Sequence, residues 1–175
     1  MGETLLFLSY AHEDDKFKKG FVDAINPALK GKNWRLWQDG EIMPGANWDD
    51  KIKKNLTEAE VIILLVSTDF LNSQYVLEVE LRESLERHKK GTALVIPIIL
   101  DGCLWEETEL QGIQAVVIHE KIKKDAKAAL QEAARKVLET IKAYKPGHAP
   151  ATALKPEEIN ELRQLDPDAI VIAVR

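Results

Sequence analysis

Two carboxylates early in one predicted helix are the side chains of this sequence best placed to do chemistry. Glu78 and Glu80 follow the apolar run Val61–Val66 and a polar segment, residues 67–73, which we predict to be a loop. An unbroken run of β-branched residues and leucine predicts a strand covered on both faces, as in a parallel sheet. Ligands of such sheets bind at the carboxyl ends of the strands, where a partly buried carboxylate can stabilise positive charge on a substrate.

Helical geometry alone does not choose between these two carboxylates. Residues two positions apart lie about 200° apart around a helix, so at most one of them faces the edge of the sheet. Both flank the apolar ridge of the predicted helix, which is formed by Leu77, Leu81 and Leu85. From the residues alone, Glu78 and Glu80 remain alternatives.

Five apolar runs predict the strands that position this helix, at residues 5–8, 34–37, 61–66, 94–100 and 115–118. Between these strands, and after the last of them, apolar residues recur at helical spacing and predict helices. An example is the series Phe17, Phe21, Ile25 and Leu29. Strands alternating with helices predict a flavodoxin-like, doubly wound α/β fold, with a five-stranded parallel sheet in the order 2-1-3-4-5 and helices on both faces. Pro97 fits the fourth strand only where its missing N–H faces an edge or a bulge.

The second strand is followed by a segment rich in turn-forming residues, from Asp39 to Asn47. A loop of this length is more often a recognition or assembly surface than a bare connector. Three aromatic residues near the predicted edge could stack on a ring of a ligand, although each could equally belong to the core: Trp37, Trp48 and Tyr75.

The composition is that of a folded globular protein. The chain has 175 residues, 45% hydrophobic and 30% charged, which fits one domain with an appendage. A net charge of −5 gives no electrostatic reason to expect a nucleic-acid or membrane partner. No run approaches the roughly 20 apolar residues that span a bilayer, and the amino terminus lacks the pattern of a signal peptide. We therefore expect a cytoplasmic protein.

Cysteine and histidine give no sign of a metal centre. Cys103 is the single cysteine, so it can form neither an internal disulfide nor a cysteine-based zinc site. The histidines show no ligand spacing with carboxylates: His12, His88, His119 and His148. The sequence also lacks the glycine patterns of dinucleotide-binding and P-loop folds. We expect neither a metal nor a cofactor.

Residues 1–145 are predicted to form one domain, and residues 146–175 are different in character. Residues 146–150 have the composition of a linker, and residues 156–165 favour a short helix with proline at its first position. The apolar residues 169–174 favour a strand that would be an exposed edge without a partner. We expect this tail to be a linker, a helix and a strand that begin a second, truncated domain.

Three motifs, taken in order, resemble the successive boxes of a Toll/interleukin-1 receptor (TIR) domain. They are Leu-Phe-Leu-Ser-Tyr at residues 6–10, the segment 37–45 before a helix that carries a tryptophan, and the segment 64–75. The strand that contains Pro97 is similar to the fourth strand of that family. The resemblance covers about residues 3–144, and ordered motifs are more specific than isolated ones.

The TIR family contains adaptors that self-associate and enzymes that cleave NAD, and this chain looks most like the bacterial enzymes. That pattern implies Glu80 as the catalytic acid, with the pair Arg87 and His88 downstream, although Val79 occupies the more common glutamate position. Nicotinamide leaves without a proton donor, so one carboxylate suffices to stabilise the oxocarbenium-like ribose. The implied substrate contacts are Ser9, Tyr10, Trp37, Asp39, Trp48 and Tyr75.

The resemblance also implies what the protein does as a whole. It predicts an NAD+ glycohydrolase or cyclase, with NAD+ as substrate rather than cofactor, that is activated when protomers associate through residues 39–47. Such an enzyme would be the effector of a bacterial anti-phage defence system. The alternative is a non-catalytic scaffold that recruits other TIR domains through the same segment.

Overall fold

The computed structural model describes residues 3–38, 48–73 and 76–144. They form a parallel five-stranded sheet in the order β2-β1-β3-β4-β5, which confirms the predicted topology. The strands are β1 (Thr4–Ser9), β2 (Trp34–Trp37), β3 (Val61–Val66), β4 (Leu94–Ile99) and β5 (Val116–Val117). The tail, residues 145–175, lies outside the described residues, so the expected second domain stays a prediction.

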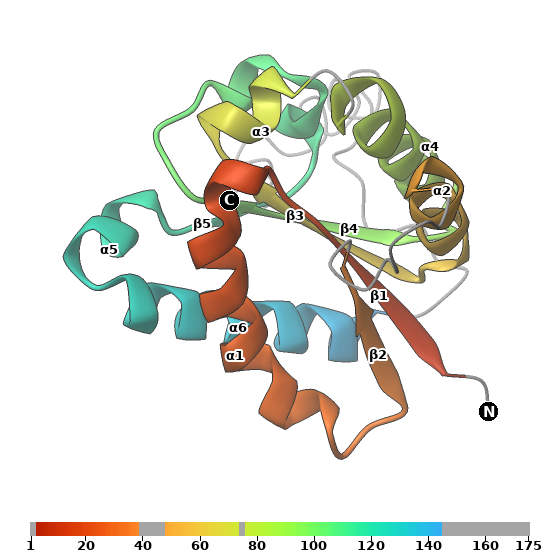
Figure 1. The fold of residues 1–175 in the computed structure, drawn as a ribbon, viewed down its shortest axis with the longest axis horizontal. Helices are drawn as coiled ribbons and strands as arrows, with labels where there is room; N and C mark the ends of the chain where they lie inside the picture. The colour runs from red at the N-terminus through yellow and green to blue at the C-terminus, as the bar shows by residue number, and fades with distance from the viewer. Residues whose placement is uncertain (1–2, 39–47, 74–75, 145–175) are drawn as a thin grey trace, which may run out of the picture.

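Helices cover both faces of the sheet (Figure 1). On one face lie α1 (Asp15–Leu29), α5 (His119–Lys124) and α6 (Ala126–Ala143). On the other lie α2 (Trp48–Glu58), α3 (Thr68–Asn72) and α4 (Arg82–Lys89), and a π-helical segment, η3 (Val76–Leu81), leads into α4. The remaining described helical elements are short 3-10 helices: η1 (His12–Asp14), η4 (Trp105–Glu107) and η5 (Glu109–Gly112).

The alternation of side chains along each strand divides the core into two clusters. In β3, Ile63 and Leu65 face the cluster that contains Phe21 of α1 and Val137 of α6. The intervening residues of β3 face the cluster on the other side, with Ile52, Leu56, Phe70, Leu81 and Leu85. All six residues of β3 are buried, as the unbroken apolar run predicts.

The predicted loop at residues 67–73 is wrong, because most of this segment is the helix α3. Ser67 is the N-cap of this helix, and its Oγ accepts a hydrogen bond from the N–H of Phe70 at 3.0 Å. Phe70 is fully buried and holds the short helix against the core. Serine is one of the preferred N-cap residues, so the polar residues of this segment mark the start of a helix rather than a loop.

Pro97 lies where a strand N–H is not needed. The N–H groups of Leu94 and Leu100 bond to carbonyls on the β3 side, so the odd-numbered residues of β4 face the β5 side. There, β5 pairs only with Ile98 and Ile99. The N–H of Val95 instead donates to Nδ1 of His88 at 3.2 Å. Pro97 therefore faces a side of β4 that has no paired strand at this position, as a proline within a strand requires.

Among the described residues, the structure contains no helix that is both long enough and apolar enough to cross a membrane.

Candidate functional site

The side chain of Glu80 lies in the core at the carboxyl end of β1. It is 7% exposed, and the hydroxyl of Ser9 donates a hydrogen bond to its Oε2. Ser9, the last residue of β1, is itself buried. A carboxylate loses much of its hydration on burial, and a donated hydrogen bond replaces part of what it loses. The structure therefore brings together two residues that are 71 positions apart in the sequence.

The π-helical segment η3 sets the direction of this carboxylate. A π turn closes i→i+5 rather than i→i+4 and so widens the helix, and such turns are frequent at functional sites. The face that η3 and α4 turn to the sheet carries two ridges. One is apolar, with Leu81 and Leu85, and the other is polar, with Glu80, Ser84 and His88; all five side chains are buried. The side chain of Glu78 lies outside the described residues.

A small cavity lies beside Glu80. Its volume of about 10 Å³ is roughly the room that one water molecule needs. It is lined by Phe7, Leu8, Ser9, Tyr10, Trp37, Ile52 and Glu80. Four of the predicted site residues thus border one cavity: Ser9 of β1 and the following Tyr10, Trp37 of β2 and Glu80 of η3.

The predicted aromatic residues are placed differently from one another. Trp37 is 5% exposed and stacks on Phe7, with ring centroids 5.0 Å apart and an interplanar angle of 21°. Tyr10 borders the cavity, but it packs against the cluster of α1 and α6, where Nζ of Lys18 lies 5.2 Å from the ring centroid. Asp39, Tyr75 and the side chain of Trp48 lie outside the described residues.

A second buried carboxyl supports the same edge of the sheet. Asp14 is 5% exposed, and Ser67 Oγ donates a hydrogen bond to its Oδ2 at 2.5 Å. Burial raises the pKa of Asp14 above its ordinary value, and the charges of Asp69 and Asp101 raise it further against the lowering effect of the Ser67 bond. Because Ser67 also caps α3, this pair ties η1 to the carboxyl end of β3.

Asp101 fixes the neighbouring end of β4. Its carboxylate accepts hydrogen bonds from the N–H groups of Thr68, at 3.0 Å and 3.1 Å, and Cys103, at 3.0 Å. Burial alone would raise the pKa of Asp101, but these bonds outweigh it and the pKa is lowered. Burial, together with the charge of Asp101, raises the pKa of the Cys103 thiol to about 11. Cys103 is therefore a thiol rather than a reactive thiolate at neutral pH.

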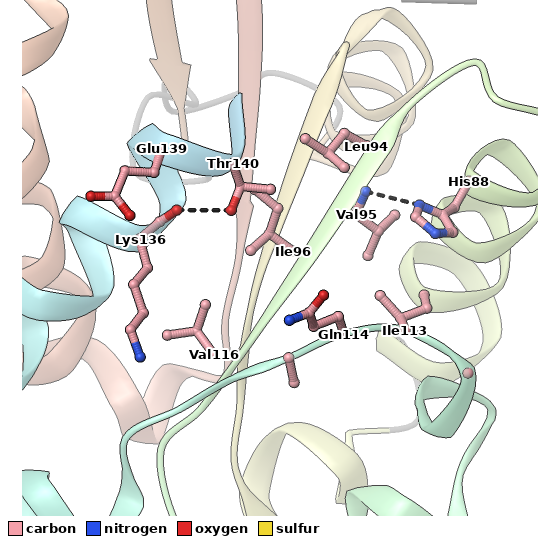
Figure 2. A pocket seen from close by; sticks show the side chains of 12 residues that line it. His88, Leu94, Val95, Ile96, Ile113, Gln114, Val116, Lys136, Glu139 and Thr140 are labelled. Atoms are coloured by element: carbon pink, nitrogen blue, oxygen red, sulfur yellow. Dashed lines mark hydrogen bonds between the residues drawn. The ribbon is translucent and has the colours of Figure 1, made fainter. Parts of the chain in front are cut away.

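A larger pocket, of about 450 Å³, lies elsewhere, along the part of β4 that β5 does not pair (Figure 2). His88 of α4 stands on one side of it, and Lys136, Glu139 and Thr140 of α6 stand on the other. The buried His88 accepts the Val95 N–H at Nδ1, so the neutral ring carries its proton on Nε2. Burial lowers the pKa of His88. This pocket contains none of the predicted substrate contacts.

The arrangement around Glu80 suits the stabilisation of a cationic centre. A buried, hydrogen-bonded carboxylate in a poorly hydrated site interacts more strongly with positive charge than one in water. Within the described parts of the chain, His, Cys, Asp and Glu side chains do not gather in any group that could hold a metal ion.

Sequence reasoning missed Ser84, which is fully buried and donates its hydroxyl to the Glu80 carbonyl at 2.5 Å. The available signal was the spacing of Glu80, Ser84 and His88 at intervals of four, which places polar residues along one ridge of a helix.

Comparison with known proteins places the chain in a family. The family model described as the TIR domain matches residues 6–134. Over 111 residues the chain is 32% identical to the uncharacterised protein y4lF of Sinorhizobium fredii, covering 63% of this chain and 34% of the relative. The matched part therefore spans about a third of that protein.

Among solved structures, the TIR domains of the activated Roq1 resistosome, which recognises the pathogen effector XopQ, align with a TM-score of 0.44 and 20% identity. That alignment covers 94% of this chain and 98% of the other. The match of the family model shows that this chain belongs to the TIR domain family.

Proposed function

We propose that this TIR domain cleaves the bond between nicotinamide and ribose in NAD+, with Glu80 as the catalytic residue. The observation that carries the proposal is the buried carboxylate of Glu80, hydrogen-bonded to Ser9 beside a cavity at the carboxyl end of β1. This is the edge at which open α/β sheets bind ligands. NAD+ is the substrate in this proposal, and no further cofactor is invoked.

The proposed chemistry needs a single acid. The C–N bond breaks and its electron pair goes to the nicotinamide nitrogen, which neutralises the pyridinium, so no proton donor is required. Positive charge moves to the ribose, where the Glu80 carboxylate stabilises it, while the Ser9 hydroxyl holds that carboxylate in place. Attack by water and loss of its proton gives ADP-ribose, and attack by a nucleophile of the same molecule gives a cyclic product.

The proposal includes activation by self-association. The described cavity has about the volume of one water molecule, so a dinucleotide needs room that these walls do not provide in this arrangement. We propose that association of protomers through residues 39–47 supplies that room, as the family resemblance implies. The same proposal includes a cytoplasmic location and a role as the effector of a bacterial anti-phage defence system.

Incubation of the protein with NAD+ and chromatography of the products tests the activity. We expect free nicotinamide, released at a rate per protein molecule that rises with protein concentration, because association is second order in protomer. The absence of nicotinamide at concentrations where light scattering detects assemblies would contradict the proposal. That outcome would favour the scaffold function instead.

A further inference from the structure

The polar ridge on η3 and α4 is unexpected in a helix face that packs into the core. Glu80, Ser84 and His88 are 7%, 0% and 5% exposed. Burying a polar group is unfavourable unless a hydrogen bond replaces its contacts with water. Alanine at position 84 would need no such hydrogen bond and has a higher intrinsic helix propensity than serine. The stability of the helix therefore gives no reason for a serine there.

Ser84 bonds to the residue that carries the proposed chemistry. Its hydroxyl donates to the backbone carbonyl of Glu80 at 2.5 Å. This bond crosses the junction between η3, which contains Glu80, and α4, which contains Ser84. At such a junction the backbone changes from i→i+5 to i→i+4 bonding, and side-chain hydroxyls bonded to the carbonyl four residues earlier alter the path of a helix. The hydroxyl is thus placed to fix where the wide turn ends.

Hydrogen bonds hold the helix α4 to the neighbouring elements. Arg87 donates from Nη1 to the carbonyl of Leu56 at 2.6 Å and from Nη2 to the carbonyl of Thr92 at 2.9 Å. The third residue of the ridge, His88, accepts the N–H of Val95 in β4. Consequently two of the described contacts position Glu80. Its carboxylate is bonded to Ser9 of β1, and its backbone is bonded to a helix anchored on α2 and β4.

We infer that Ser84 is a positioning residue for the proposed reaction: its hydroxyl fixes the Glu80 backbone so that the carboxylate meets the reacting ribose. This inference rests on the proposed function. Because small displacements of a reacting group lower the rate far more than they lower substrate affinity, the loss of this bond should affect kcat and leave KM nearly unchanged.

Steady-state release of nicotinamide by Ser84→Ala, together with thermal unfolding, tests the inference. We expect kcat to fall about ten- to a hundredfold, with KM within about twofold and a melting temperature close to that of the unaltered protein. Ser84→Cys keeps the shape of the side chain with a somewhat larger atom and offers only a weak donor, so its kcat should fall as well. A merely structural serine would lower the melting temperature and leave kcat unchanged.

Val137→Ala is the matched control. Val137 is fully buried in α6, on the opposite face of the sheet, so its truncation lowers stability without touching Glu80. We expect its kcat to be unchanged. Full activity of Ser84→Ala or Ser84→Cys in an active wild-type background, or an equal loss in Val137→Ala, would overturn the role of Ser84 alone. A wild-type protein that releases no nicotinamide would overturn the proposed function and this inference together.

Discussion

Three of the buried polar side chains in this structure each accept a hydrogen bond in the core. Glu80 accepts the Ser9 hydroxyl, Asp14 accepts the Ser67 hydroxyl, and His88 accepts the Val95 N–H. Such groups are expensive to bury, so their bonds, rather than their sequence positions, decide which of them face the core. The sequence left Glu78 and Glu80 open for this reason. The resemblance implied Ser9 as a substrate contact, but the sequence did not predict its hydrogen bond to one of these carboxylates.

The titration of His88 gives a prediction at the residue scale. Burial lowers its pKa below the ordinary 6.5, so the folded protein favours the neutral ring. As the pH falls below 6.5, the unfolded chain binds a proton that the folded chain does not bind, and stability decreases. His88→Gln removes this titration and keeps an acceptor. Between about pH 7 and about pH 5 its free energy of unfolding, measured by urea denaturation, should fall less steeply than that of wild type. Equal slopes would show that His88 is not held neutral.

At the scale of elements, the apolar patterns of the sequence predicted the strands well, because fully buried parallel strands leave unbroken runs such as Val61–Val66. The irregular local elements were harder to predict from the sequence. The helix α3 begins after the N-cap Ser67, and η3 contains a π turn, which is rare in proteins. Neither of these elements produces a periodic pattern of apolar residues in the sequence. Of these two irregular elements, η3 is the one that carries Glu80.

The contact between α1 and α6 gives a prediction at this scale. A Cβ atom at Gly20 would lie 2.7 Å from Cδ1 of Leu130 in α6, so the end of that side chain would have to shift. Because this atom is the end of a flexible side chain, Gly20→Val should destabilise the protein by about 1 kcal/mol, at the lower end of the cost of overpacking. Gly31→Val is the control, since a Cβ there meets no atom within 4 Å, and it should change stability by less than about 0.5 kcal/mol. Equal effects in denaturant unfolding would contradict this account of the helix contact.

At the scale of the whole molecule, the strand order β2-β1-β3-β4-β5 was predictable, since alternating elements and right-handed crossovers leave few topologies. The topology brings Ser9 of β1, Trp37 of β2 and Glu80 of η3 to one edge, where the proposed chemistry takes place. The cavity that they line is smaller than a dinucleotide requires. In our proposal, substrate binding therefore requires the association of protomers, because the described walls of this cavity leave too little room for a dinucleotide.

The comparison of Glu80→Gln with Glu78→Gln tests the central claim most directly. The two variants make the same chemical change two residues apart in η3, and a glutamine at position 80 can still accept the Ser9 hydroxyl, so the fold should persist. We predict that Glu80→Gln lowers nicotinamide release from NAD+ by about a hundredfold or more, whereas Glu78→Gln keeps most of it. Substantial activity in a folded Glu80→Gln protein would contradict the assignment of this carboxylate.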